Sequence, residues 1–306
     1  MGRTRVVILG PTAAGKSEIA LVLVRRLNAE IVGADSRQIY RGLEIGTAAP
    51  SDRDRTIAPH HLASFLDPGE TYSAGRYARD ARAVLAEVES RGRAAVIVGG
   101  SGLYLRALLE GLFEGPARDD AVRARLAERL RSEGLEALRV ELGRVDAEAL
   151  RSIFPGDAVR VIRALEVHEL TGKPISALRR ERRGTPVPAR RFGIRWARTD
   201  LAGRIASRIR TQLADGFLEQ ARELSRAGLA AGAPGLETLG YRELLAHLEG
   251  RGSLDEAVET IALRTRQLAK RQEAWFRGVD EVTWFTLESP GQFPEVAAEI
   301  ERRIEP

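Results

Sequence analysis

Apolar residues in the first third of the chain form two kinds of pattern, short unbroken runs and stripes that recur every three or four positions. Three runs predict buried strands: Val6–Leu9, Ile31–Val32 and Ala94–Val98. Stripes with helical spacing lie between and after them, over residues 16–27, 81–88 and 103–112. Strands that alternate with helices imply crossover connections, so we predict an α/β fold with a doubly wound parallel sheet of the P-loop NTPase type, flanked by helices.

The pattern changes from Asp119 to Leu170, where it is helical throughout. We interpret residues 116–189 as an all-helical insertion and residues 1–115 with 190–306 as the catalytic core. Within that core the pattern predicts two more strands, at 192–196 and 282–287, and helices over 201–227, 240–249 and 255–277. Residues 179–191 contain glycine and two prolines and are interpreted as a connector.

Composition limits the kinds of site and the compartment. The 306 residues include no cysteine, which excludes disulfides, iron–sulfur clusters and cysteine-bound zinc. No apolar run approaches the roughly 18 residues of a membrane helix, and the N-terminus does not resemble a signal peptide, so we expect a cytoplasmic protein with no membrane partner. The net charge of +5 permits a polyanionic partner without identifying one.

The segment GPTAAGKS matches G-x-x-x-x-G-K-[ST] at every fixed position, between a predicted strand and a predicted helix. Its members are Gly10, Pro11, Thr12, Ala13, Ala14, Gly15, Lys16 and Ser17. The backbone N–H groups of such a loop point inward onto phosphate oxygens, and the helix N-terminus adds partial positive charge. We expect Lys16 to neutralise phosphates and the Ser17 hydroxyl to bind Mg²⁺.

The metal-binding acid of many P-loop enzymes is missing after the strand Ala94–Val98, which is followed by Gly-Gly-Ser-Gly. The acid that is best placed is Asp35, which follows the second predicted strand, and there it could orient or deprotonate an acceptor molecule. Asp35 and Ser36 also fit a simple helix or turn cap. The sequence thus favours group transfer to an acceptor over a motor or a switch, and leaves both roles of Asp35 open.

Several segments together resemble the tRNA dimethylallyltransferase family, whose members prenylate N6 of the adenosine at position 37, beside the anticodon. They follow the family's order over residues 5–277 and comprise Gly10–Ser17, Asp35–Gly42, Gly46–Ala48, Pro59–Leu62, Gly99–Tyr104, Arg163–Val167, Thr171–Pro174 and Thr265–Gln272. The joint pattern is far more specific than a phosphate loop alone. One departure is Ala49, where the family usually has lysine.

The resemblance implies that the loop holds the diphosphate of dimethylallyl diphosphate, with Mg²⁺ as cofactor. Negative charge grows on that diphosphate as the allylic C1–O bond breaks, and Lys16, the loop amides and the metal at Ser17 would stabilise it. Arg208 matches a family arginine on the diphosphate, and Asp35 matches the residue that takes the proton from the adenine amine. Thr12 and Ser101 match positions around the donor and the entering base.

The resemblance also names tRNA as partner and implies a monomer. The implied tRNA-binding residues are Asp35, Ser36, Arg37, Gln38, Ser101, Arg123, Val159, Arg160, Val161, Ile162, Arg163, Arg266 and Lys270. Because the acceptor base is stacked in the anticodon loop, the enzyme must extrude it, and we expect the helical insertion to contact the RNA. The arginine-rich strip 179–191 is a candidate phosphate contact, although a solvated connector fits its composition equally well.

Two other functions stay open on the sequence alone. A P-loop small-molecule kinase would consume ATP and use Asp35 to activate a hydroxyl acceptor. An RNA-binding module with a vestigial loop would bind tRNA without turnover. The helical insertion and the segment Thr265–Gln272 favour the transferase over both.

Overall fold

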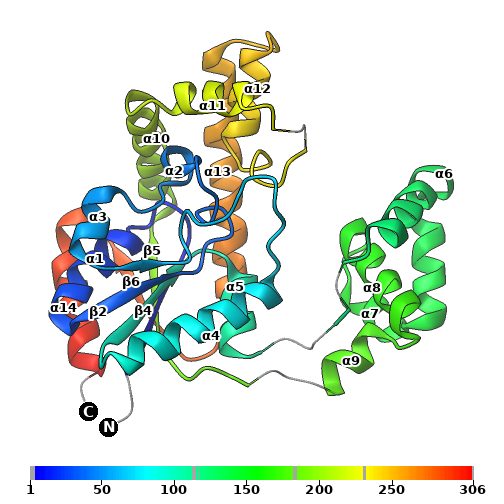
Figure 1. Cartoon of the computed structure of the whole chain (residues 1–306), viewed down its shortest axis with the longest axis horizontal. Coiled ribbons are helices and arrows are strands. Elements are labelled where there is room, and N and C mark those ends of the chain that lie inside the picture. The colour runs from blue at the N-terminus through cyan, green and yellow to red at the C-terminus, as the bar shows by residue number, and fades with distance from the viewer. Residues whose placement is uncertain (1–3, 112–114, 117, 182–184, 230–231, 305–306) are drawn as a thin grey trace. The chain divides into compact units, whose positions relative to one another are not determined.

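Two units with separate hydrophobic cores make up the chain in the computed structural model, which describes residues 4–111, 115–116, 118–181, 185–229 and 232–304 (Figure 1). The first unit joins Met1–Leu109 to Val187–Pro306, and the second is the intervening Glu110–Pro186. The helical insertion expected at 116–189 begins and ends a few residues later than this second unit.

A six-stranded sheet, parallel throughout, forms the centre of the first unit, in the order β3-β2-β4-β1-β5-β6. The strands are β1 (Arg5–Leu9), β2 (Ala29–Gly33), β3 (His60–His61), β4 (Ala94–Gly99), β5 (Arg190–Trp196) and β6 (Val282–Leu287). The chain leaves central β1 toward β2 on one side and later returns to β5 on the other. The predicted doubly wound α/β fold is therefore confirmed, and the two-residue edge strand β3 is an addition to it.

Helices cover both faces of this sheet (Figure 1). Helix α1 (Lys16–Leu27) packs beside α14 (Phe293–Ile304), while α4 (Ala74–Ser90) packs beside α5 (Gly102–Leu109). Val6 and Ile8 of β1 share one core cluster with Ile19 and Leu23 of α1. Because side chains alternate along a strand, the equally buried Val7 points to the opposite face, and this burial of both faces explains the unbroken apolar runs.

The remaining helices of this unit lie around the ends of the strands. They are α2 (Glu44–Thr47), α3 (Asp52–Ile57), α10 (Arg198–Ala214), α11 (Phe217–Arg226), α12 (Tyr241–Leu248) and α13 (Leu254–Phe276), with a 3₁₀ turn η1 (Pro290–Gln292) before α14. The single helix expected over 201–227 is two, α10 and α11. The chain breaks at Gly216, whose φ of 95° only glycine adopts readily.

The second unit is entirely helical in its described residues and contains α6 (Asp120–Val145), α7 (Ala147–Ser152), α8 (Ala158–Thr171) and α9 (Ile175–Glu181). Gly134 kinks α6 with a φ of 81°. The connector expected at 179–191 is only partly irregular, because α9 includes Arg179 and β5 begins at Arg190, while Arg182, Arg183 and Gly184 lie outside the described residues. Neither these helices nor those of the other unit, as far as the chain is described, combine the length and apolarity that a membrane span needs.

Candidate active site

The carboxyl ends of β1, β2, β4 and β5 meet at one edge of the sheet, and each leads into a predicted site segment. The phosphate loop follows β1, Asp35 follows β2, and Ser101 follows β4. Open α/β sheets bind ligands at this edge, where the connections diverge to opposite sides. The topology therefore brings together residues that are more than eighty positions apart in the sequence, such as Lys16 and Ser101.

The phosphate loop is held in an unusual backbone shape by its neighbours. Gly10 has a φ of 144°, and a Cβ there would lie 2.3 Å from the Ile194 carbonyl oxygen of β5. Gly15 has a φ of 90°, and its Cβ would overlap the ring of Phe293. Both positions require glycine, for conformation and for space. The Trp196 indole donates to the Ala14 carbonyl at 2.9 Å and fixes the loop from the next strand.

Two arginines one turn apart on α10 hold the other side of the loop. Arg208 donates to the Thr12 hydroxyl at 3.3 Å and to the Thr47 carbonyl at 3.1 Å. Arg204 donates to the Ala13 carbonyl at 2.8 Å and stacks over Trp196 at 4.4 Å. The resemblance implied a role for Arg208 alone, but the i, i+4 spacing to Arg204 places both on one helix face and was a usable signal.

The loop carries a partly buried cluster of charge. Lys16 donates from Nζ to the Pro11 carbonyl at 2.7 Å. Burial lowers the pKa of Lys16 to about 8, against the attraction of Asp35, and the nearby positive charge of Arg208 adds to the lowering. Burial likewise lowers the pKa of Arg208, again against Asp35. Two cations thus converge on the loop, with the carboxylates of Asp35 and Glu18 in their surroundings. A bound polyphosphate would add negative charge where the two cations meet.

Asp35 caps the turn that follows β2 and lies beside Ser101. Its Oδ1 accepts from the backbone N–H groups of Arg37 at 2.8 Å and Gln38 at 3.4 Å. Ser101 accepts from the Ser36 N–H at 2.8 Å and donates to the Ser36 hydroxyl at 3.1 Å. The turn-cap interpretation is therefore realised through Oδ1, and in the described part of the chain no hydrogen bond is recorded to Oδ2.

The side chains of Arg37 and Gln38 contact different segments of the chain. Gln38 donates to the carbonyls of Thr47 at 3.1 Å and Ala48 at 2.8 Å. Arg37 is exposed and donates to the Pro234 carbonyl at 3.0 Å. Because Thr47 also accepts from Arg208, its carbonyl joins the acceptor turn to the arginine at the phosphate loop.

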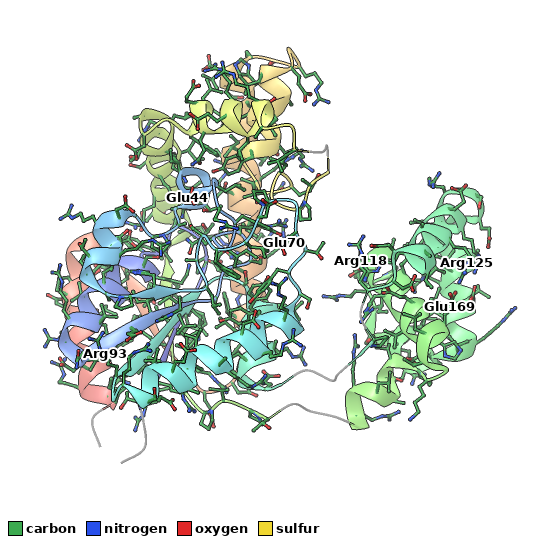
Figure 2. The ribbon with its side chains drawn as sticks, viewed as in Figure 1. Glu44, Glu70, Arg93, Arg118, Arg125 and Glu169 are labelled. Carbon is green, nitrogen blue, oxygen red and sulfur yellow. The ribbon has the colours of Figure 1, made fainter. Side chains whose placement is uncertain are left out.

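A groove of about 700 Å³ opens beside this arginine, between α2 and α10. Arg204, Ser207 and Arg208 line one wall, and Ala48 and Ala49 line the other. Glu44, which Figure 2 labels on α2, also lines it. Ala49, the departure from the family pattern, thus lies on the wall of a groove that is also lined by Arg204 and Arg208, the two arginines that contact the phosphate loop.

A metal site built from protein side chains alone is not present in the described residues, where no three His, Cys, Asp or Glu side chains gather in a suitable group. Ser17 is exposed in the first turn of α1, directly after Lys16. A hydroxyl oxygen is a hard ligand of the type that Mg²⁺ accepts, and Mg²⁺ commonly takes its other ligands from substrate phosphates and water. The residues present therefore fit a magnesium ion that arrives with a diphosphate.

In the second unit, the expected tRNA-binding residues divide into buried and exposed ones. Glu166 of α8 is fully buried and accepts from Arg123 at 2.8 and 3.0 Å and from Arg163 at 2.7 Å. Burial alone would raise the pKa of Glu166, but these arginines and the Asp119 amide hold it at about 2. Arg123 and Arg163 therefore stabilise this unit's core, whatever else they contact.

Their neighbours on α8 face other environments. Val161 is fully buried in the helical core, which leaves its side chain no access to RNA, and Ile162 is partly buried. Val159 is 76% exposed, and the Arg160 side chain is 66% exposed. Further along, Glu169 pairs with Arg125 of α6 at the surface (Figure 2). Of the run 159–163, the first two side chains are the ones best presented to a partner.

In the first unit, α13 carries the last two expected tRNA-binding residues. Arg266 and Lys270 are exposed and lie one turn apart. Gln272 follows two residues later and turns inward, where it accepts from the Thr12 N–H at 2.8 Å and donates to the Gly100 carbonyl at 2.9 Å. No role was predicted for Gln272 from the sequence, although the residue ends the last of the matching segments.

Comparison with known proteins supports one family. The family model described as IPP transferase matches residues 38–279. A tRNA dimethylallyltransferase of Geobacter metallireducens is 43% identical over 301 residues, which cover 97% of each chain. One of Methylococcus capsulatus is 42% identical over 303 residues, which cover 98% of this chain and 97% of the relative.

Solved structures agree with these sequence matches. The full-length tRNA isopentenylpyrophosphate transferase of Bacillus halodurans superposes with a TM-score of 0.71 at 33% identity, over 99% of this chain and 97% of that one. A eukaryotic dimethylallyltransferase acting on tRNA gives a TM-score of 0.80 at 23% identity, over 98% of this chain and 78% of that one. At that lower identity the second match supports the fold alone.

Proposed function

Because this chain belongs to the IPP transferase family, we propose that it transfers the dimethylallyl group of dimethylallyl diphosphate to N6 of the adenosine 3′ of the anticodon in tRNA, and releases diphosphate. The observation that carries the proposal is that Asp35 follows β2 at the same edge of the sheet as the phosphate loop after β1, within electrostatic reach of Lys16 and Arg208. This edge of the sheet has a carboxylate that can act on an acceptor and a loop that can bind an anion. The combination suits group transfer from a diphosphate.

We assign the leaving group to the phosphate loop. The bond between C1 of the dimethylallyl group and the diphosphate oxygen breaks, and its electron pair stays on the diphosphate. Lys16, the loop amides and Arg208 bind that growing charge, and the planar guanidinium can hold two oxygens at once. Thr12 belongs to the same cradle, because Arg208 holds its hydroxyl. A partly buried site strengthens each of these contacts relative to bulk water.

We assign the acceptor to the turn after β2. The adenine amine is a weak nucleophile, since its lone pair is delocalised into the ring, so loss of its proton during attack assists the reaction. Asp35 takes that proton as the new N6–C1 bond forms, a contribution of about 10²–10⁴-fold for a positioned general base. Its Oδ1 is held by two backbone N–H groups, which orients the carboxylate before the base enters.

We assign Mg²⁺ to the Ser17 hydroxyl and the diphosphate oxygens. When bound, the ion supplies positive charge to the leaving group. Lys16 and Arg208 do the same from the protein side, so the chain's own cations carry part of this role.

We assign tRNA recognition to exposed basic and polar residues. Arg37, Arg160, Arg266 and Lys270 are the exposed candidates in the described chain, while Ser36, Gln38 and Ser101 line the turn beside Asp35. The extruded base would enter at this turn. We also propose the cytoplasm as the compartment in which the protein acts.

Labelled dimethylallyl diphosphate incubated with an unmodified tRNA transcript tests the proposal. Magnesium-dependent label on the adenosine beside the anticodon is the expected result, and affinity for the tRNA should fall steeply with added salt. Label transferred from the γ-phosphate of ATP to a small molecule would support the kinase instead. Binding of tRNA with no turnover would leave only an RNA-binding module.

A further inference from the structure

Gln272 lies between the two halves of the site and contacts both with one side chain. Its carbonyl oxygen accepts from the Thr12 N–H of the phosphate loop, 260 residues away in the sequence, at 2.8 Å. Its amide nitrogen donates to the carbonyl of Gly100, beside Ser101, at 2.9 Å. A single carboxamide thus spans the gap between the loop after β1 and the turn after β4.

Helix α13 approaches this turn so closely that the turn needs glycine. A Cβ at Gly100 would lie 2.4 Å from the Gln272 amide nitrogen, and one at Gly102 would lie 2.4 Å from the Trp275 ring. Gln272 and Trp275 are three residues apart and share one face of the helix. The Gln272 side chain is therefore held in place by packing as well as by its two hydrogen bonds.

At neutral pH a carboxamide satisfies both partners and a carboxylate does not. The Thr12 N–H requires an acceptor and the Gly100 carbonyl requires a donor, so the two ends of the amide cannot be exchanged. A carboxylate has no donor for Gly100, and an apolar side chain leaves both backbone groups unpaired in a partly buried place. This requirement is chemical, because a residue that only filled space could be replaced by any side chain of similar shape.

The contacts beyond Gln272 lead to both substrates. Thr12, whose N–H Gln272 holds, has its hydroxyl held by Arg208. Ser101, which follows Gly100, accepts from the Ser36 N–H next to Asp35. We propose that Gln272 is a positioning residue that fixes the spacing between the donor diphosphate at Thr12 and the acceptor base at Asp35 and Ser101. The inference rests on the proposed function and adds a residue to it.

Two substitutions test the assignment, Gln272→Met and Gln272→Glu. Both keep the side chain's length, and thermal melting establishes that each variant is folded. Misplacement of two reactants by about 1 Å costs up to about 10²-fold in rate, so kcat for prenylation of the tRNA transcript should fall about tenfold or more in both. The KM for tRNA should change little, because Gln272 faces inward.

The pH profile separates positioning from loss of packing. A protonated Glu at 272 can donate to Gly100 and accept from Thr12, so the ratio of Gln272→Glu to wild-type kcat should rise as the pH falls. Lys16 and Arg208 at the phosphate loop and Asp35 at the turn after β2 are present in both proteins, so the wild-type rate at each pH serves as the reference. Gln272→Met has no group to titrate, so its ratio should stay flat.

Amide hydrogen exchange gives a readout that does not depend on catalysis. In wild type the Thr12 amide should be protected by Gln272, and in Gln272→Met its exchange should be faster. A wild-type kcat in Gln272→Met, a flat ratio in Gln272→Glu, or unchanged exchange at Thr12 would each overturn the inference. If the wild type fails to prenylate tRNA, the proposed function falls while the exchange result still decides whether Gln272 holds the loop.

Discussion

Arg208 donates to the hydroxyl of Thr12 at 3.3 Å across 196 residues of sequence, so a helix that follows β5 closes over the loop that follows β1. The other nitrogen of its guanidinium reaches Thr47. Arg208→Lys keeps the charge and loses this fork, so we expect the KM for dimethylallyl diphosphate to rise and kcat/KM to fall by about 10²-fold. Steady-state kinetics with labelled donor measures both, and Arg210→Lys, an exposed position on the same helix, is the matched control.

Asp35→Asn should remove the proton acceptor and keep the structure of the turn. The asparagine oxygen can accept the same two backbone N–H groups that Oδ1 accepts now, so the turn should persist. We expect kcat to fall about 10²–10⁴-fold while donor and tRNA affinities stay near wild type. Single-turnover rates and filter binding measure the two effects separately. Turnover at the wild-type level in this variant would exclude Asp35 as the base.

Lys16 should make donor binding sensitive to alkaline pH. Its pKa of about 8 means that the free enzyme loses this positive charge as the pH rises through that value, so affinity for the donor should fall there. Titration calorimetry with dimethylallyl diphosphate from pH 7 to 9.5 measures the change. A flat affinity over that range would contradict the assignment of Lys16 to the diphosphate.

Lys16→Met should lose activity and gain stability. Folding lowers the pKa of this lysine, so the protonated side chain is less favourable in the folded protein than in the unfolded chain at pH 7. An uncharged Met removes this cost and raises the free energy of unfolding. We expect the melting temperature to rise by about 2–4 °C and kcat/KM to fall by about 10²-fold or more. Lys173→Met, at an exposed position in the helical unit, should do neither.

Arg123 and Arg160 should separate structural from RNA-binding roles in the helical unit. Arg123→Ala leaves the buried Glu166 carboxylate with Arg163 and the Asp119 N–H as its remaining partners, which costs about 1.5–3 kcal/mol of stability, so proteolysis within residues 110–186 should accelerate. Arg160→Ala removes an exposed charge, so it should weaken tRNA binding and reduce its salt dependence without a change in melting. Equal effects of the two on melting would contradict this division.

Acid should weaken the same unit through Glu166. Its pKa is about 2 in the folded chain and 4.5 as its ordinary value, so the unfolded chain binds more protons between these values and stability rises with pH across that window. The stabilisation is present above pH 4.5 and is lost as the pH falls toward 2. Denaturant titrations at pH 7, 4 and 3 should show that the free energy of unfolding falls with pH in wild type. The fall should be smaller in Glu166→Gln.

The features that were predicted best are those that depend on residues close together in the sequence. The helix over 16–27 has the bounds that the structure gives, because both flanking residues, Gly15 and Asn28, are left-handed. The phosphate loop is recognisable since its function depends on consecutive backbone groups. The break at Gly216 and the strand β3 were not predicted, because periodicity runs through the first and the second is too short to show any.

The rest of the site depends on contacts that no local pattern encodes. Arg204 and Gln272 touch the loop from helices that lie far along the chain. The spacing of Arg204 to Arg208 and the place of Gln272 in a matching segment were signals of a role, but neither signal identifies the loop as the partner. The buried state of Val161 and the pairing of Arg123 follow from how α6 and α8 pack. Tertiary packing decides which member of a basic or apolar run is accessible, and the run alone carries no such information.

The helical unit leaves and rejoins the sheet-containing unit at adjacent backbone positions. Val187, where the chain returns, donates its N–H to the carbonyl of Leu108 at 3.3 Å. The backbone of the sheet-containing unit is therefore joined by a hydrogen bond at the point where the helical unit is inserted. A short glycine linker in place of residues 110–186 would preserve this junction, and the same two positions would accept the corresponding segment of a relative.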